Sequence, residues 1–265
     1  MDADDTGDDG RVSTEVRGRV LLIGLDRPAK LNGVTPPMMA QLVDAYERLD
    51  TDPGLWAGVV FGHGPHFTAG LDLPRWTEAM AAGGQRSSRD RVDPMAFGRG
   101  CRTPVIFAVS GITYTVGIEL MLAGDIVIAA DDCRFAQLEP KRGIHATGGA
   151  TFRFVERAGW GNAMLHLLTG DEFGAAEAHR IGLVQEIVPA GTELDRAFEL
   201  AEAICSAAPL AVQATKASAR RFVVEGRQAC IDALGPTQAE LMATADATEG
   251  VASFVERRPA RFEGR

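Results

Sequence analysis

The sequence predicts an α/β protein that ends in a helical region. Four short apolar runs alternate with segments of helical periodicity, and glycine, proline or polar turns separate them. Continuous apolar runs are typical of strands in a sheet whose two faces are both covered. After residue 194 the apolar residues recur at helical spacing. We therefore expect an α/β core followed by a helical appendage.

The first half of the core contains two candidate strands and one helix. The strand at 20–25 follows a turn and ends at Asp26-Arg27-Pro28, because proline cannot continue a central strand. Thr35 precedes two prolines, so we expect it to cap a helix with one apolar face, formed by residues 38, 42, 45 and 49. Asp52-Pro53-Gly54 ends this helix, and the second strand lies at 56–61.

The second half of the core continues the alternation. A helix is expected to begin near Leu73, and the polar, glycine-rich segment 81–88 is expected to be a mobile loop. Two further strands and a short helix between them follow, at 104–109, 125–130 and 116–122. In the helical appendage, breaks are expected at Pro209 and Pro236.

Composition narrows the function classes. The net charge of −9 includes five aspartates within the first ten residues, so we expect 1–11 to be a disordered acidic tail. The sequence has no large cluster of basic residues that would favour binding to nucleic acid or to an anionic membrane. It also has no apolar run long enough to span a membrane. The four cysteines are far apart, which disfavours disulfides and zinc and fits a cytoplasmic protein. The expected organisation is therefore tail 1–11, core 12–193 and helical region 194–265.

Three strand-to-turn junctions carry the residues of chemical interest, at 67–73, 109–120 and 134–140. Glu119 follows a turn and lies within an apolar helix, where burial would raise its pKa. Glu139 precedes a proline, which disfavours helical geometry at that position. Taken alone, an ordinary turn is the better explanation of the first junction, a loop carboxylate explains Glu139, and none of the three junctions decides the function. The chain has no phosphate loop, nucleophile elbow or HExxH motif, and its histidines lack metal-ligand spacing, so no metal is expected.

In order, these segments resemble the crotonase (enoyl-CoA hydratase/isomerase) superfamily. Residues 25–32 resemble the opening block L-N-R-P-x-x-x-N, 67–73 resemble F-S-A-G-x-D-L, and 103–120 resemble K-P-V-I-A-A-V-x-G-x-A-x-G-G-G-x-E-L. The likeness continues through 168–184 and 249–265, so it covers nearly the whole chain after about residue 15. It implies an α/β fold with a crotonase-like ββα spiral core and a C-terminal helical oligomerisation domain.

The resemblance also implies an activity and a set of catalytic groups. The amides of Leu71 and Val116 would form an oxyanion hole for a thioester carbonyl. Glu119 would orient and deprotonate water, and Glu139 would deliver a proton to the α-carbon, which together hydrate a 2-enoyl-CoA. Two carboxyls in one closed pocket repel, so one is expected to be protonated at rest. No separate cofactor is implied, because coenzyme A enters as part of the substrate.

The resemblance further implies how the acyl-CoA partner binds. Contacts with coenzyme A would come from Ala29, Lys30, Leu31, Ala69, Asp72 and Phe262. Phe262 would reach the site from a neighbouring subunit, because the family's helical appendage forms homotrimers or dimers of trimers. A solvated basic tail explains the arginines of 257–265 equally well.

Departures from the family pattern leave alternatives open. Val116 stands where the family has glycine, and a β-branched residue resists a positive φ and narrows the acyl pocket. His145 and Thr147 add polarity near Glu139, and Tyr114 is a bulky residue close to the expected hole. A double-bond isomerase, a racemase or lyase acting through the same enolate, and a non-catalytic acyl-CoA binder therefore remain alternatives.

Overall fold

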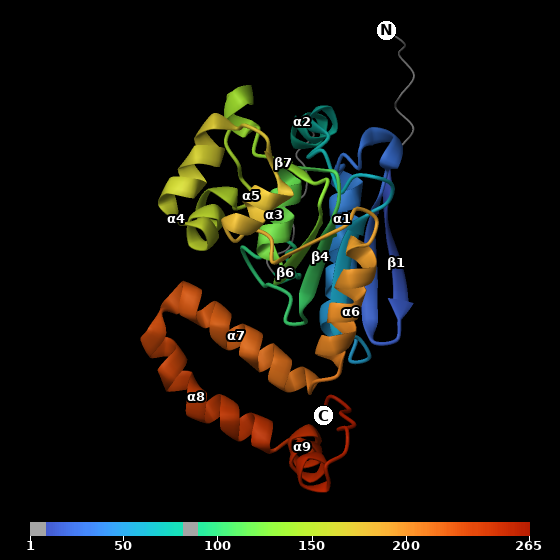
Figure 1. Ribbon diagram of the computed structural model, residues 1–265, viewed down its shortest axis with the longest axis vertical. Coiled ribbons are helices and arrows are strands. Elements are labelled where there is room, and N and C mark those ends of the chain that lie inside the picture. Colours follow the sequence, from blue (N-terminus) through green and yellow to red (C-terminus); the bar gives the residue numbers. More distant parts are fainter. Residues whose placement is uncertain (1–8, 82–89) are drawn as a thin grey trace.

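The computed structural model describes residues 9–81 and 90–265. Most of the expected acidic tail 1–11 and most of the expected loop 81–88 lie outside these described residues. Figure 1 shows a layered α/β core, with helices α7 to α9 extending from one end of it. None of the helices in the described ranges is long and apolar enough to cross a membrane.

Within the described residues, the larger sheet has six strands in the order β1-β2-β3-β4-β6-β9. Only β1 and β2 pair antiparallel, and every later pair in this sheet is parallel. A smaller sheet has the order β5-β7-β8. The strands of the larger sheet are β1 (Arg11–Arg17), β2 (Val20–Asp26), β3 (Ala57–Gly62), β4 (Val105–Val109), β6 (Ile126–Ala130) and β9 (Glu186–Val188). Those of the smaller sheet are β5 (Ile112–Tyr114), β7 (Arg134–Ala136) and β8 (Phe173–Gly174).

The chain alternates between the two sheets, which is the ββα spiral that the sequence resemblance predicts. Strand β4 leads directly into β5 of the smaller sheet, and β6 leads into β7. The helices and 3₁₀ turns of the core are η1 (Pro28–Lys30), α1 (Pro36–Thr51), α2 (Leu73–Ala81), α3 (Val116–Ala123), η2 (Glu139–Arg142), α4 (Ala150–Thr169), α5 (Ala175–Arg180) and α6 (Glu193–Cys205). The remaining helices are α7 (Pro209–Glu225), α8 (Arg227–Met242) and α9 (Ala245–Glu256).

Several local signals act as the sequence predicts. Thr35 caps α1, since its hydroxyl accepts a hydrogen bond from the Met38 amide at 3.3 Å. Pro209 begins α7, where its missing amide hydrogen leaves no bond unmade. Pro236 differs from expectation, because it lies inside α8 and does not end that helix.

Helix α6 lies on the sheet and not with the appendage. Residues Ala197 and Ala201 pack against one face of the larger sheet, on apolar side chains of β2, β3, β4 and β6. Helices α1 and α3 contribute to the core on the other face. The expected boundary at residue 194 thus falls at the start of a helix that covers the core, and the helical arm that leaves the core begins at α7 (Figure 1).

Candidate active site

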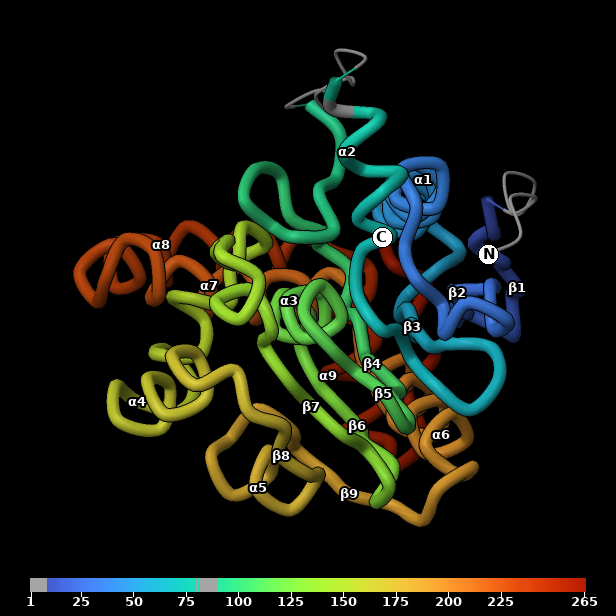
Figure 2. Tube along the Cα trace, turned by 90° about the horizontal axis from the view of Figure 1, so that it is seen from above, coloured from blue at the N-terminus to red at the C-terminus, as the bar shows by residue number. Residues whose placement is uncertain are grey.

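A cavity of about 410 Å³ lies where the two sheets and their loops meet the N-terminus of α3. Figure 2 shows α3 between β1 and β2 on one side and α4 on the other. The lining comes from five pieces of chain: η1 and its neighbours, the segment after Ala69, the start of α3, η2, and Thr147. Both glutamates expected at the site, both expected oxyanion residues, and Lys30, Ala69 and Asp72 line this cavity.

Helix α3 presents an amide and a carboxyl to the same cavity. It is apolar on all sides, and nearly all of its residues are buried, so packing holds it rigidly. Val116 is its first residue, and Glu119 lies three residues later on the same face. The first amides of a helix have no partner within it and favour negative charge.

The Glu119 carboxylate is fixed by backbone amides. Its Oε1 accepts hydrogen bonds from the amides of Gly148 at 2.6 Å and Ala150 at 3.3 Å. Burial raises the pKa of Glu119, while these two bonds and the positive charge of Arg153 oppose the rise. A side chain at Gly148 would collide with the carboxyl group, so only glycine permits this approach. The orientation of Glu119 is therefore set by a loop about thirty residues further along the chain.

Glu139 has a different environment. It begins η2 and is 8% exposed, and its Oε1 accepts a hydrogen bond from Gln137 Nε2 at 3.2 Å. Its Oε2 is buried and has no hydrogen-bond partner among the described residues. Burial raises the pKa of Glu139 to about 7, and the nearby charge of Glu119 adds to the rise. Near neutral pH Glu139 can thus hold a proton and give it up.

The amides of Leu71 and Val116 are both available. Leu71 pairs with Val34 as in a parallel sheet, through its two neighbours: the Val34 amide donates to the Gly70 carbonyl, and the Asp72 amide donates to the Val34 carbonyl. Backbone groups alternate in direction along an extended segment, so the Leu71 amide points away from Val34. Neither the Leu71 nor the Val116 amide donates a hydrogen bond to any described residue. Two amides without an acceptor in the described residues therefore belong to residues that line the same cavity as the two carboxyl groups.

The backbone strain expected at Val116 falls on its neighbour. Val116 has helical geometry, and Thr115 has φ 48° and ψ −114°, a conformation that few non-glycine residues adopt. The Thr115 amide donates to the Ala136 carbonyl at 3.0 Å, and its hydroxyl lies where a Cβ on Gly70 would be. The conflict between a β-branched Val116 and a positive φ therefore does not arise, because Thr115 makes the sharp turn into α3.

Arg153 connects the Glu119 loop to the segment before β4. Its guanidinium donates to the Gly148 carbonyl at 2.9 Å and to the Met95 carbonyl, and it lies over the rings of Phe97 and Phe152. Burial lowers the pKa of Arg153. Arg153 thus joins the loop at Gly148, which holds Glu119, to the segment around Met95.

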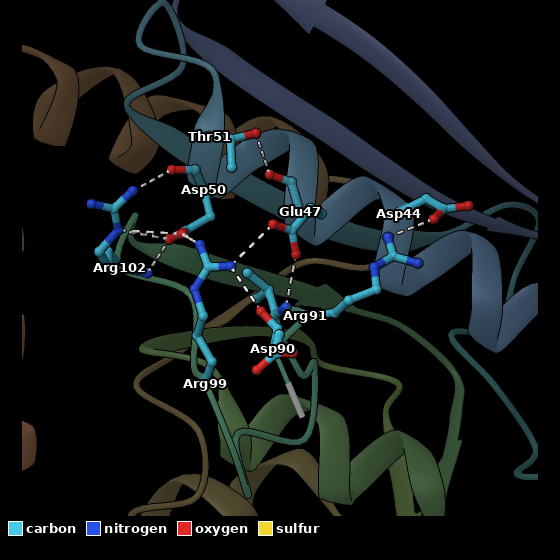
Figure 3. A network of polar contacts seen from close by, with 9 residues as sticks. Asp44, Glu47, Asp50, Thr51, Asp90, Arg91, Arg99 and Arg102 are labelled. Carbon is cyan, nitrogen blue, oxygen red and sulfur yellow. Dashed lines mark hydrogen bonds and ion pairs between the residues drawn. The ribbon is translucent and has the colours of Figure 1, made fainter. Parts of the chain in front are cut away.

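That segment is anchored by an ion-pair network at the end of α1 (Figure 3). The Asp50 carboxylate is fully buried and accepts from the Arg102 amide at 2.6 Å and from Arg102 Nε at 3.2 Å. Arg99 bridges Asp50 and Glu47, and Glu47 also accepts from the Val92 amide. These bonds hold 90–102 against α1, and through Met95 they support Arg153.

The residues expected to contact coenzyme A are only partly gathered at the cavity. Asp72 accepts a bond from Arg27 Nη1 at 2.8 Å, an arginine that the sequence did not single out. The Leu31 carbonyl accepts from the Ala69 amide at 2.9 Å, although neither Leu31 nor Ala29 lines the cavity.

Phe262 lies in the C-terminal segment that folds back on α9, where Asp246 accepts bonds from the amides of Glu263 and Gly264. This segment is at the far end of the molecule from α2 and α3 (Figure 1), so Phe262 does not reach the cavity of its own chain. Tyr114 also points elsewhere, since its hydroxyl donates to Glu172 and it does not line the cavity.

Sequence reasoning missed Arg27, Gln137, Arg142 and Arg153 as parts of the site or its support. Gln137 lies two residues before Glu139 and is 1% exposed, and a polar residue beside an expected acid was the available signal. Arg142 lies one turn after Glu139 in η2 and lines the cavity. Nothing local in the sequence marks Arg153, because its partners come from distant segments.

Comparisons with known proteins identify relatives along nearly the whole chain. The sequence profile described as "Enoyl-CoA hydratase/isomerase" matches residues 15–265. Enoyl-CoA hydratase EchA19 of Mycobacterium tuberculosis is 33% identical over 95% of this chain and 96% of its own. The 2,3-dehydroadipyl-CoA hydratase of Escherichia coli is 32% identical over 93% of this chain and 96% of its own.

Solved structures show the same likeness. A probable enoyl-CoA hydratase/isomerase from Mycobacterium abscessus superposes with a TM-score of 0.93 and 47% identity, over 97% of this chain and all of that one. The fold, the match over nearly the whole chain and the two relatives lead to one conclusion: this chain belongs to the enoyl-CoA hydratase/isomerase family.

Proposed function

We propose that the protein adds water across the 2,3 double bond of a 2-enoyl-CoA thioester. The observation that carries this proposal is the pair of buried carboxyls at one cavity in opposite hydrogen-bonding states. Glu119 is held by two backbone amides, and Glu139 keeps one oxygen without a partner among the described residues. A hydratase needs one group to position water and another to hold a proton, and these two environments suit those roles.

The proposed reaction begins with polarisation of the thioester carbonyl. The amides of Leu71 and Val116 donate to the carbonyl oxygen and stabilise the enolate that forms, by about 3 kcal/mol for each such donor in comparable sites. Polarisation makes the β-carbon electrophilic. Water held by Glu119 adds to that carbon and passes its proton to the Glu119 carboxylate.

The reaction ends with proton transfer to the α-carbon. Glu139 Oε2 gives its proton to that carbon as the enolate collapses, so the product carries hydroxyl on the β-carbon and hydrogen on the α-carbon. Glu139 has then lost one proton and Glu119 has gained one, and exchange with solvent restores both. A pKa of about 7 lets Glu139 be protonated before the step and ionised after it.

The names of the relatives support hydration, because EchA19 is an enoyl-CoA hydratase and the Escherichia coli relative is a 2,3-dehydroadipyl-CoA hydratase. An isomerase would use chiefly Glu139. Two backbone amides fix Glu119 at the same cavity, and this favours a reaction that uses both acids.

Direct assay tests the proposal. Hydration of crotonyl-CoA is followed by loss of the enone absorbance, in the wild type and in Glu119→Gln, Glu139→Gln and the exposed control Glu199→Gln. We expect the first two variants to lose at least about a hundredfold in kcat, as removal of a general acid or base commonly does, and the control to match the wild type. Isomerisation of a 3-enoyl-CoA with no hydration would instead support the isomerase, and binding without turnover would support the non-catalytic alternative.

We also propose that the working form is a homotrimer or a dimer of trimers. Helix α8 has no buried residue, and α7 to α9 expose large apolar side chains, among them Phe222, Val224, Leu234, Phe254 and Val255. Such a surface is typical of an oligomer interface. Light scattering coupled to size-exclusion chromatography would measure the mass, and a monomer at micromolar concentration would contradict this proposal.

In the trimer, we place Phe262 of one subunit near the coenzyme A of the next, since it does not reach its own cavity. Coenzyme A contacts at Lys30, Ala69 and Asp72 are part of the same proposal. The reaction as written needs no cofactor or metal beyond the substrate. A reducing cytoplasm suits the four free cysteines, of which Cys101 and Cys133 are buried.

A further inference from the structure

Two polar side chains lie at the η2 end of the cavity. Arg142 and Thr147 both line the cavity and are exposed. Neither side chain forms a hydrogen bond or ion pair with any residue in 9–81 or 90–265. The adjacent cation is different, because Lys141 pairs with Asp171 at 2.7 Å. As far as the described chain goes, Arg142 thus offers an unengaged guanidinium to whatever occupies this end of the cavity.

The acids of the cavity do not neutralise Arg142. Asp72 is paired with Arg27, and the Glu119 carboxylate is held by backbone amides. Glu139 has no ion pair with Arg142 in the described residues, and burial raises its pKa, with the charge of Glu119 adding to the rise. Among the described residues, no acid of the cavity therefore forms an ion pair with Arg142.

The order of groups along the cavity gives the direction of the substrate. Turn η1 follows β2, whereas η2 packs on α4. Figure 2 shows β2 and α4 on opposite sides of α3. Coenzyme A lies on the η1 side in the proposed function, and the carbonyl lies at the amides of Leu71 and Val116. An acyl chain that enters from the η1 side and passes Glu139 would come to Arg142 and Thr147, which line the same cavity.

We propose that Arg142, aided by the Thr147 hydroxyl, binds an anionic group at the far end of the acyl chain. The substrate class is a 2-enoyl-CoA whose acyl chain ends in a carboxylate. This inference rests on the proposed hydration at the same cavity. A 3₁₀ helix rises about 2 Å per residue, so Arg142 lies about 6 Å along the axis from Glu139. A carboxylate a few carbons beyond the β-carbon is within reach, and the guanidinium fork can bind its two oxygens together.

A matched pair of substrates tests the inference. One is the CoA thioester of trans-2-hexenedioic acid, and the other is trans-2-hexenoyl-CoA, which has the same six carbons without the distal carboxylate. The quantity measured is the ratio of kcat/KM for the diacid to kcat/KM for the monoacid. Arg142→Gln is compared with the wild type, with Arg142→Lys, and with the control Lys141→Gln, which removes the neighbouring charge.

We expect the ratio to fall about tenfold or more in Arg142→Gln, as loss of a hydrogen bond to a charged group commonly gives. Arg142→Lys should retain part of the ratio because the charge remains, and Lys141→Gln should keep the wild-type ratio. The inference is overturned if Arg142→Gln keeps the wild-type ratio, or if Lys141→Gln lowers it as much.

A second arm separates a carboxylate from the phosphates of coenzyme A as the anion that Arg142 binds. The same two acyl groups are presented as pantetheine thioesters, which lack phosphate. Persistence of the tenfold fall supports the acyl carboxylate. A fall in kcat/KM for both CoA substrates that disappears with pantetheine would assign Arg142 to phosphate and overturn the inference. Wild-type turnover of hexenoyl-CoA but not of the diacid would overturn this inference alone, whereas no turnover of either would overturn the proposed function.

Discussion

Gly148→Ala is the most direct test of how the Glu119 carboxyl is held. The Gly148 amide donates to Glu119 Oε1 at 2.6 Å. A Cβ added at Gly148 would lie 2.6 Å from the Glu119 Cδ and closer still to Oε2. The φ of Gly148 is outside the left-handed region, so alanine fits the backbone and the collision is with the Glu119 side chain, whose Cβ would also lie only 3.0 Å away.

The size of the effect follows from these distances. Non-bonded carbon atoms are comfortable at about 3.5–4.0 Å, so the carboxyl must move by about 1 Å. A shift of about 1 Å in a catalytic group commonly lowers the rate by about a hundredfold. Weakening a hydrogen bond to a charged group costs about 1.5–3 kcal/mol, and we expect the free energy of unfolding to fall by about that amount.

The assay is steady-state hydration of crotonyl-CoA, with unfolding in urea measured in parallel. We expect kcat to fall about a hundredfold while KM changes little, because the amides that bind the thioester are untouched. Gly161→Ala is the control, since nothing lies within 4 Å of its added Cβ and it sits within α4. A kcat for Gly148→Ala within threefold of the wild type would show that Glu119 is not held, or not used, as described.

Four further outcomes follow from the same structure. Hydration needs protonated Glu139, whose pKa is about 7, so kcat/KM for crotonyl-CoA should fall as pH rises through that value. If Glu139→Gln shows the same fall in kcat/KM above pH 7, Glu139 is not the group that titrates. Asp50→Asn should lower the free energy of unfolding by about 2–4 kcal/mol, because it breaks a buried charge network, whereas the exposed Asp44→Asn should cost less than about 1 kcal/mol. The lowered pKa of Asp50 means that its stabilisation is complete above its ordinary pKa of 3.8 and is lost as pH falls below it, which acid titration of unfolding would measure. Thr115→Gly should raise the free energy of unfolding by about 1 kcal/mol, because relief of the backbone strain outweighs the extra entropy that glycine gives the unfolded chain. If urea unfolding shows a decrease of that size instead, the contact between the Thr115 hydroxyl and Gly70 stabilises the protein more than the strain destabilises it.

Local sequence patterns predicted the elements whose stability is local. The cap at Thr35, the proline at the start of α7 and the apolar strands β2, β3, β4 and β6 all occur where periodicity and turn residues place them. Strand β1 was missed, because its exposed, polar residues carry no strong pattern and it is formed by pairing with β2. Helix α6 was assigned to the appendage, because periodicity shows that a helix has an apolar face but not what that face covers.

The sequence by itself determined the family, the order of elements and the positions of Glu119 and Glu139, since these depend on residue types at recognisable intervals. Only the tertiary structure decided how the two acids differ. The amides that hold Glu119 come from Gly148 and Ala150, and the burial that raises the pKa of Glu139 comes from elements packed around η2. It also decided that Thr115, and not Val116, takes the strained turn, and that Arg142 faces the cavity without a partner in the described chain. Protonation and strain depend on contacts between segments far apart in sequence, and no local pattern records those contacts.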